Sequence, residues 1–127
     1  MGEISGILNS ATGELVLRAL DAGVARHAVH AANVANASVE GYRPLRLEFE
    51  DQLAAARSAL LSRDEAVAKR AVAQLEPRVA PDAGAKEVQL DREVALMTEN
   101  SVRYQALLGA LGKNGALLRL AIREGRN

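Results

Sequence analysis

The chain has 127 residues, a length that accommodates one domain and argues against two independent cores. Sixteen basic and sixteen acidic side chains give a net charge of zero, so no long-range field draws the protein to nucleic acid or to an anionic membrane surface. The absence of Cys excludes disulfides and thiolate metal sites.

The apolar residues are mostly small or aliphatic. Hydrophobic residues make up 49% of the chain and aromatic residues only 2%, while about one residue in five is Ala. A core of Ala, Leu and Val suits closely approaching helices and suits sheets poorly, so we predict an all-α fold in one domain over residues 1–127. Residues 1–8 lack the features of a cleaved signal peptide, and no run of about 18 apolar residues could span a bilayer.

A first helix is predicted over residues 12–37. Its seam follows the alternating spacing of four and three residues that is typical of a heptad repeat. The seam positions are Gly13, Leu17, Leu20, Val24, His27, Ala31 and Val34. Many flanking residues are Ala or Gly, so partner helices can approach this helix closely on several faces.

The middle of the chain has a less regular pattern. Residues 38–47 are predicted to form a turn, because they contain a glycine that permits positive φ and Pro44, which ends the helical pattern. A helical middle segment is expected over residues 48–75, with a candidate interruption at Ser62-Arg63-Asp64. Residues 76–89 contain two prolines and a glycine, which predict a loop.

The strongest helical pattern covers residues 90–123. Its seam runs without a break through Leu90, Val94, Met97, Ser101, Tyr104, Leu108, Leu111, Gly115, Leu118 and Ile122. Three glycines in this stretch each weaken a helix by about 1 kcal/mol relative to Ala, which indicates close packing or a bend. We expect the two terminal helices to pair as an antiparallel coiled coil. Because such a hairpin buries little area, the isolated monomer should be marginally stable.

Two histidines on the first helix are the main candidates for a metal site. His27 and His30 are three residues apart, a spacing that places two ligands on one face. A useful site needs a third ligand, and only Asp21 and Glu40 are nearby in the sequence. We therefore favour one seam histidine and one flanking polar residue over a metal site.

No group of residues predicts catalysis. Asp91 and Glu93 point to different faces of a helix, and with Glu99 they are expected to form a solvated face rather than an acid/base pair. The sequence contains no nucleophile elbow, no phosphate-binding glycine loop and no dinucleotide fingerprint. Three aromatic residues and no basic stripe also argue against stacking on nucleic acid. We expect no enzyme activity, no cofactor and no metal.

The stretch that ends the first helix resembles the N-terminal signature of flagellar rod and hook axial proteins. In that family the signature reads Asn, two residues, Asn, a polar turn and then Thr-Pro-Gly-Tyr. The matching residues are Asn33, Asn36, Gly41 and Tyr42, while Val39 and Glu40 replace the usual Thr and Pro. The resemblance implies that both asparagines hold the helix end through side-chain to backbone bonds and that Gly41 supplies the turn conformation.

The C-terminal helix is similar to that of proximal-rod members of this family. The similarity lies in Leu90-Asp91-Arg92-Glu93, Glu99-Asn100 and Arg103-Tyr104-Gln105-Ala106. The short chain also fits these members, since the family's longer members carry large inserted β-domains. The resemblance implies an assembly surface on this helix made by Asp91, Arg92, Glu93, Asn100, Arg103, Tyr104, Gln105, Leu108, Leu111 and Leu118. Tyr42 and Tyr104 would be the main aromatic contacts.

The resemblance also implies partners and a location. Family members are uncleaved substrates of the flagellar type III export apparatus and polymerise in the periplasm at the base of the rod. The expected partners are copies of the chain, other rod proteins, the basal-body protein that joins the rod to the export gate and MS ring, and the export apparatus. No nucleic acid and no direct membrane insertion are expected. The alternatives are a cytoplasmic helical adaptor or export chaperone and, more remotely, a small metal-dependent enzyme that uses His27 and His30.

Overall fold

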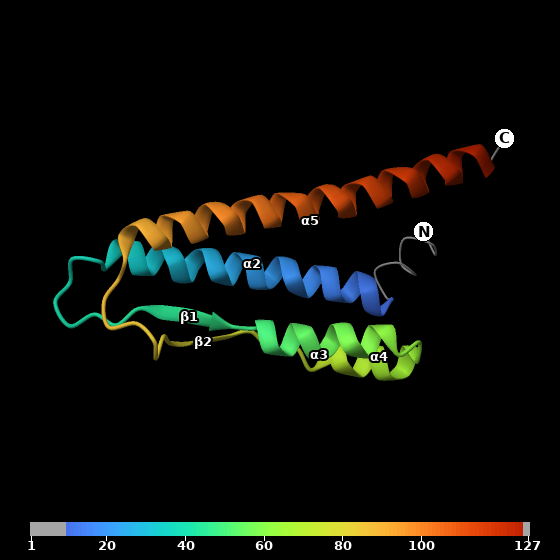
Figure 1. Cartoon of the computed structure of the whole chain (residues 1–127). Helices are drawn as coiled ribbons and strands as arrows, with labels where there is room; N and C mark the ends of the chain where they lie inside the picture. The colour runs from blue at the N-terminus through green and yellow to red at the C-terminus, as the bar shows by residue number, and fades with distance from the viewer. Residues whose placement is uncertain (1–9, 126–127) are drawn as a thin grey trace.

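The computed structural model describes the backbone of residues 10–125 and the side chains of residues 10–112. Its elements lie in three layers, with the C-terminal helix on one side, the first helix in the middle, and a strand pair with two short helices on the other side (Figure 1). In chain order the elements are α2 (Ala11–Ala35), β1 (Leu45–Glu48), α3 (Glu50–Leu61), α4 (Glu65–Ala73), β2 (Arg78–Pro81) and α5 (Leu90–Gly125).

Helix α2 is the central element and contacts both outer layers. Ser10 begins it, because the Ser10 hydroxyl accepts a hydrogen bond from the Gly13 amide at 3.0 Å and satisfies one of the free N–H groups of the first turn. Buried residues occur on both sides of the helix, which matches the prediction of small side chains on several faces. Helix α5 lies beside α2 and runs in the opposite direction (Figure 1).

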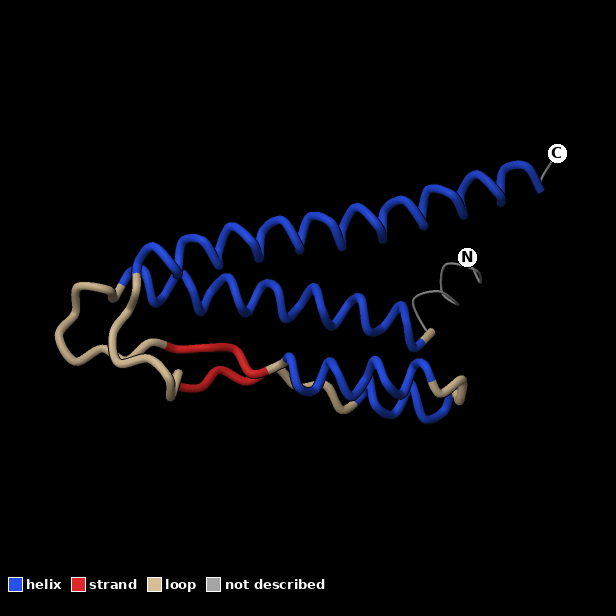
Figure 2. Tube along the Cα trace, viewed as in Figure 1, coloured by secondary structure: helices blue, strands red, loops and turns tan. Residues whose placement is uncertain are grey.

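The third layer begins and ends with the two strands. β1 and β2 pair antiparallel, with Leu45 opposite Pro81 and Glu48 opposite Arg78 (Figure 2). Leu45 and Leu47 are half-buried on the side of α2, while the intervening Arg46 and the last residue Glu48 are exposed. The alternation is that of a sheet with one covered face and one solvated face.

Helices α3 and α4 form a hairpin inserted between the two strands. Arg63 lies in the turn between these helices with a φ of 64°, an uncommon conformation for a residue other than glycine. Asp64 begins α4, since its carboxylate accepts hydrogen bonds from the Ala66 and Val67 amides. The predicted interruption at residues 62–64 is therefore present.

The core is small and lies where α2, α3 and α4 meet. Its buried members are Ala11, Ala22, Phe49, Ala56, Ala68, Val72 and Leu75, with four half-buried leucines around them. Phe49 is the single Phe of the chain and the largest side chain in this cluster. A core dominated by Ala allows the helices to approach closely but removes relatively little apolar area from water.

Three predictions about the fold need correction. The chain is mostly helical, but the paired strands at residues 45–48 and 78–81 show that it is not purely all-α. The strands occupy parts of the predicted turn over residues 38–47 and of the predicted loop over residues 76–89. The predicted middle segment over residues 48–75 is helical, with the expected interruption between α3 and α4. Strands of four residues leave little signal in a sequence, because they are too short for a clear alternation: two residues of β1 and three of β2 are exposed.

The face of α5 that packs on α2 also differs from the predicted seam. Leu90, Val94 and Leu108 are exposed, whereas Glu93, Asn100 and Leu107 are buried or half-buried. Met97, Tyr104 and Leu111 of the predicted seam are half-buried, as expected. The other buried positions lie one residue before the predicted ones, so the contact face is shifted around the helix. On α2, Leu17, Val24 and His27 of the predicted seam are exposed as well. The shift arises because polar residues of α5 find partners on α2, as described below.

Helix α5 is longer than the helix that it packs against. Its 36 residues and the 25 residues of α2 correspond to about 54 Å and about 38 Å at 1.5 Å per residue. Its C-terminal part extends past the first turn of α2 (Figure 1). Within the described residues, no helix is both long enough and apolar enough to cross a membrane.

Candidate assembly interface

Asn33 is the central residue of the turn that follows α2. Its side chain is fully buried, its Nδ2 donates to the Leu45 carbonyl at 2.9 Å, and its Oδ1 accepts from the Leu45 amide at 2.9 Å. The Tyr42 hydroxyl donates to the same Oδ1 at 2.9 Å. One amide side chain thus joins the end of α2 to the start of β1. Asn33 was expected to bond to the end of its own helix. Its side chain instead bonds to the backbone twelve residues further along the chain.

Asn36 and Gly41 shape the same turn in different ways. The Asn36 side chain donates to the Ala32 carbonyl at 2.8 Å and so closes the last turn of α2. Gly41 has a φ of 79°, in the region that side chains disfavour. In the same turn the Tyr42 amide donates to the Val39 carbonyl at 3.2 Å, and Val39 and Glu40 are both exposed. The four residues that match the family signature therefore belong to one turn.

The two terminal helices come into close contact at Gly23. A Cβ atom placed on Gly23 would lie 3.1 Å from the Tyr104 ring, a contact so tight that the ring would have to shift by a few tenths of an ångström. Next to this contact, the buried Asn100 donates to the Gly23 carbonyl at 2.9 Å. Arg26 reaches the Asn100 Oδ1 at 3.4 Å and Glu50 at 3.3 Å, and so links all three layers.

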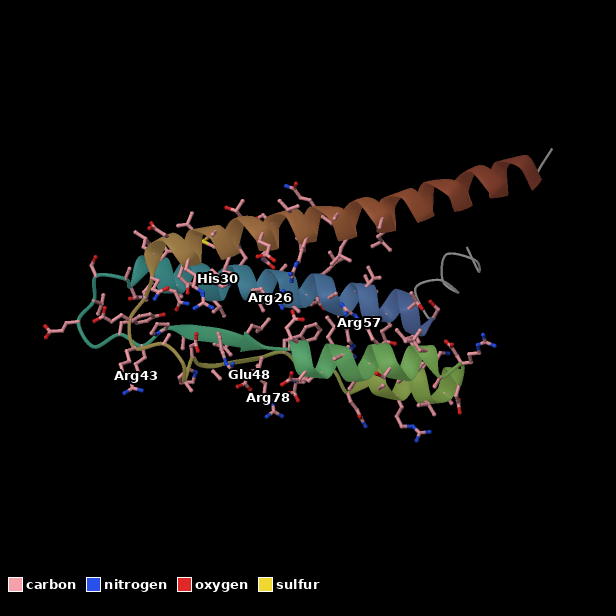
Figure 3. All side chains as sticks on the ribbon, in the orientation of Figure 1. Arg26, His30, Arg43, Glu48, Arg57 and Arg78 are labelled. Carbon is pink, nitrogen blue, oxygen red and sulfur yellow. The ribbon has the colours of Figure 1, made fainter. Side chains whose placement is uncertain are left out.

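A histidine–carboxylate pair joins α2 to the beginning of α5. His30 Nδ1 lies 2.6 Å from Glu93 Oε2, and both side chains are only 12% exposed. Figure 3 shows His30 and Arg26 on the part of α2 that lies along α5. The prediction of a solvated Glu93 is wrong, because its carboxylate is removed from water and paired. The pair is ionic when His30 is protonated, and a hydrogen bond in its neutral form.

The other residues predicted on α5 do not all face the same way. Asp91, Arg92 and Gln105 are exposed, and Arg103 pairs with Glu99 at 2.8 Å on the surface. Leu108 is 44% exposed and Leu111 is half-buried. Leu118 lies outside the described side chains. The sequence-predicted residues are thus divided between the contact with α2 and the outer surface of α5.

An exposed stripe runs along one flank of α5, beside the contact with α2. It consists of Leu90, Val94, Ser101, Gln105 and Leu108, and its three apolar members are each 44–49% exposed. These five residues fall within about 60° of one another around the helix axis, at 3.6 residues per turn. Across a shallow hollow that Ser101 and Gln105 line, Val24 of α2 is 57% exposed and extends the apolar surface.

A groove lies between α2, α3 and α5. Its volume is about 640 Å³, and its apolar lining comes mainly from Leu15, Val16, Phe49, Leu53 and Leu107. Its charged lining residues are three arginines and one glutamate, namely Arg26, Arg57, Arg103 and Glu50. Figure 3 shows Arg57 projecting from α3 toward α2. The groove therefore combines an apolar lining with an excess of positive charge.

These features suit binding between surfaces. Among residues 10–112, no three side chains of His, Cys, Asp or Glu come together in a way that could hold a metal ion. His27 is exposed, whereas His30 is half-buried and contacts Glu93. The arrangement can bind apolar and carboxylate-bearing groups.

Comparison with known proteins adds no assignment, because no protein-family model and no curated protein matches this chain.

Three contributors to the site are not apparent from the sequence. Gly23 stands among many small residues of α2, and nothing in the pattern distinguishes it from them. The His30–Glu93 pair joins residues 63 positions apart, and Arg26 joins side chains of two other elements. The polar residues that make these contacts lie beside the predicted seam positions, and the spacing of the apolar residues alone did not indicate that they have buried partners.

Proposed function

We propose that this chain is a structural subunit of the proximal rod of the bacterial flagellar basal body, comparable to the rod protein FlgB, and that it serves flagellum-dependent motility. It polymerises with copies of itself and with other rod proteins through its terminal helices. The subunit is not an enzyme and requires no cofactor.

The observation that carries the proposal is the turn around Asn33. The residues that match the axial-protein signature are Asn33, Asn36, Gly41 and Tyr42, and they converge on one hydrogen-bonded turn. A chance match of four residues would not require Tyr42 and Asn33 to share a bond. The turn sets the direction in which the chain leaves the first helix, and so orients the third layer against the helix pair.

The pairing of the terminal helices supports an assembly role. The proposal takes this pair as a short antiparallel coiled coil whose outer sides remain available to neighbouring subunits. Large apolar side chains are exposed on it, including Val24, Val94 and Val102, which are 49–62% exposed. Such residues on one side of a small protein are typical of a surface that is covered in an assembly.

Export and location follow from the same proposal. The subunit passes through the flagellar type III export apparatus without a cleaved signal peptide and assembles in the periplasm. There it contacts other rod proteins and the basal-body protein that joins the rod to the export gate and MS ring. An Ala-rich core with one Phe supports this route, because a marginally stable chain unfolds readily for passage through a narrow channel.

Mass spectrometry of purified hook–basal bodies tests the proposal. Particles are extracted with detergent from the bacterium that encodes the chain and compared with its cytosol. We expect the chain to be enriched in the particles at a few copies each. Its absence from complete particles, together with free protein in the cytosol, would refute the rod assignment and favour a cytoplasmic adaptor or export chaperone.

A substitution in the turn provides a genetic test. Gly41→Val places a β-branched side chain at a φ of 79°, which costs about 1–3 kcal/mol and displaces the turn. We expect cells that carry this variant to lose swimming, as scored in soft agar, while Val39→Thr cells swim normally. Normal swimming of Gly41→Val cells with normal protein levels would contradict a role of the turn in assembly.

A further inference from the structure

We infer that the exposed stripe of α5 in one copy docks into the groove between α2, α3 and α5 of the next copy. The inference rests on the proposed function and names the surfaces through which the chain binds itself. The stripe is Leu90, Val94, Ser101, Gln105 and Leu108, and the groove is the one lined by Leu15, Val16 and Leu107 together with residues of α3.

The groove has the size and charge to receive a helix surface. A volume of about 640 Å³ accommodates several aliphatic side chains from a neighbouring helix. Arg26, Arg57 and Arg103 border it, against the single carboxylate of Glu50. Arg26 pairs with Glu50 at 3.3 Å and Arg103 pairs with Glu99 at 2.8 Å, whereas within the described residues Arg57 has no ion-pair partner and supplies the unpaired positive charge of the groove. The groove therefore selects a partner surface that is apolar and carries carboxylates.

The stripe of α5 has that chemistry. Leu90, Val94 and Leu108 are exposed within about 40° of one another around the helix axis. Asp91 flanks them, and the two described basic residues of α5, Arg92 and Arg103, lie on the other side of the helix. A second copy of this chain can thus offer both apolar side chains for the groove and a carboxylate for its arginines.

Geometry makes this contact heterologous and repeating. The stripe and the groove are made by different residues of α5. Arg103 and Leu107 of the groove are more than 90° away from the stripe around the helix axis, while Tyr104, which also lines the groove, is about 40° from its edge. One copy can therefore donate its stripe to one neighbour and accept the stripe of another. A contact of this kind that does not close on itself generates an open helical array.

Site-specific cross-linking of full-length protein tests the inference. Because the native chain has no Cys, any disulfide must join the introduced positions. Val16→Cys marks the groove and Val94→Cys marks the stripe, and the two variants are mixed under mild oxidation. Val79→Cys on β2, 55% exposed, replaces Val94→Cys in the control mixture. Circular dichroism checks that each variant keeps the helical content of the wild type.

We expect the Val16→Cys and Val94→Cys chains to form a mixed disulfide dimer at least fivefold faster than the control mixture. Disulfides chiefly between two Val94→Cys chains would overturn the inference, because they indicate stripe-to-stripe pairing. A rate equal to that of the control would overturn it as well. If these variants lose helical content, a photo-activated cross-linker placed at the exposed Gln105 in the wild-type background gives the same test by peptide mapping.

Charge reversal supplies an independent readout. Arg57→Glu in the groove copy, or Asp91→Arg in the stripe copy, should slow mixed-dimer formation by about fivefold, the equivalent of about 1 kcal/mol. Combining the two reversed copies should restore the rate. Rescue cannot arise from misfolding, and failure of the combined copies to recover would contradict the assigned charge pairing.

Repeating the cross-link in isolated basal bodies separates this inference from the proposed function. If the chain is present in the particles but the Val16–Val94 disulfide does not form there, the docking inference fails and the rod assignment stands. If purified chains cross-link as expected while the particles lack the protein, the interface stands and the rod assignment fails.

Discussion

At the scale of single residues, the Asn33 side chain makes the hydrogen bonds that a neighbouring strand would otherwise make with the backbone of Leu45. The backbone N–H and C=O of Leu45 would face the end of α2 without partners, and the Asn33 amide satisfies both at 2.9 Å. A buried amide is costly unless it is hydrogen-bonded, and here the Tyr42 hydroxyl donates the second hydrogen bond to the Asn33 Oδ1. No apolar residue of similar size could perform this task.

We therefore predict that Asn33→Ala lowers the free energy of unfolding by about 2–4 kcal/mol. The Leu45 amide and carbonyl would lose their partners inside the protein, and a polar group that is left unsatisfied costs about 1–3 kcal/mol. Urea denaturation followed by circular dichroism measures the change. The matched control is Asn36→Ala, which removes one bond at a partly exposed helix end and should cost less than about 1 kcal/mol. Equal losses in the two variants would contradict the role assigned to Asn33.

The residue scale also shows the limit of prediction from sequence. The family resemblance singled out Asn33, but not its partner, because the bond to Leu45 depends on how the turn folds back. Glu93 was assigned to a solvated face because helical spacing alone places it away from Asp91. Its burial depends on His30, which is 63 positions earlier in the chain. Local spacing determines the face on which a residue lies, but it does not determine what covers that face.

At the scale of elements, the His30–Glu93 contact determines how α5 begins against α2. Both side chains are 12% exposed, so their interaction is screened by solvent much less than that of a surface pair. A double-mutant cycle with His30→Gln and Glu93→Gln should give a coupling energy of about 1–3 kcal/mol at pH 6, measured by urea denaturation. The Arg46–Glu48 pair, 55% and 44% exposed, should give no more than about 0.5 kcal/mol. Equal coupling in both cycles would show that burial adds nothing to the contact.

The glycines of the two terminal helices are predicted to respond in opposite ways. Gly23→Leu places side-chain atoms where Tyr104 already lies, and should destabilise the protein by about 1–3 kcal/mol. Gly109→Ala meets no neighbour within 4 Å and should stabilise α5 by up to about 1 kcal/mol through helix propensity alone. Thermal melts followed at 222 nm measure both variants. A stabilising Gly23→Leu would mean that α2 and α5 are not held in close contact at this point.

Prediction of the elements was best where the pattern is long. The two terminal helices were expected nearly over their full lengths, because repeated spacing over several turns identifies a helix without knowledge of its partner. The side that α5 turns toward α2 was predicted one position away, since Glu93 and Asn100 interrupt the apolar pattern where the contact is made. The glycines at 109 and 112 were taken as signs of close packing or of a bend. Both face open space, and a close contact lies at Gly23 instead.

At the scale of the whole molecule, α2 packs against two layers, and its small residues lie in both contacts. Its predicted seam assumed a single partner helix, whereas the structure packs α5 on one side and the third layer on the other (Figure 2). The strand pair could not be predicted, because its two strands are separated by the whole α3–α4 hairpin. The fold class could be predicted only to the extent that local helix patterns dominate the chain.

The same arrangement leads to a prediction about concentration. With a small Ala-rich core and an exposed stripe on α5, the proposed association of copies would supply part of the stabilising burial. Binding that is specific to the folded state raises apparent stability, by about 2.7 kcal/mol when a partner is at a hundred times its dissociation constant. We therefore expect the thermal midpoint of the purified chain to rise by several degrees over a hundredfold increase in protein concentration. Val94→Lys, at a half-exposed position, should remove this rise while leaving the midpoint of the dilute protein nearly unchanged. Val72→Ala, at a fully buried position, should instead lower the midpoint at every concentration. A wild-type midpoint that does not depend on concentration would contradict the prediction, because it would show that the isolated chain is stabilised by its own core alone.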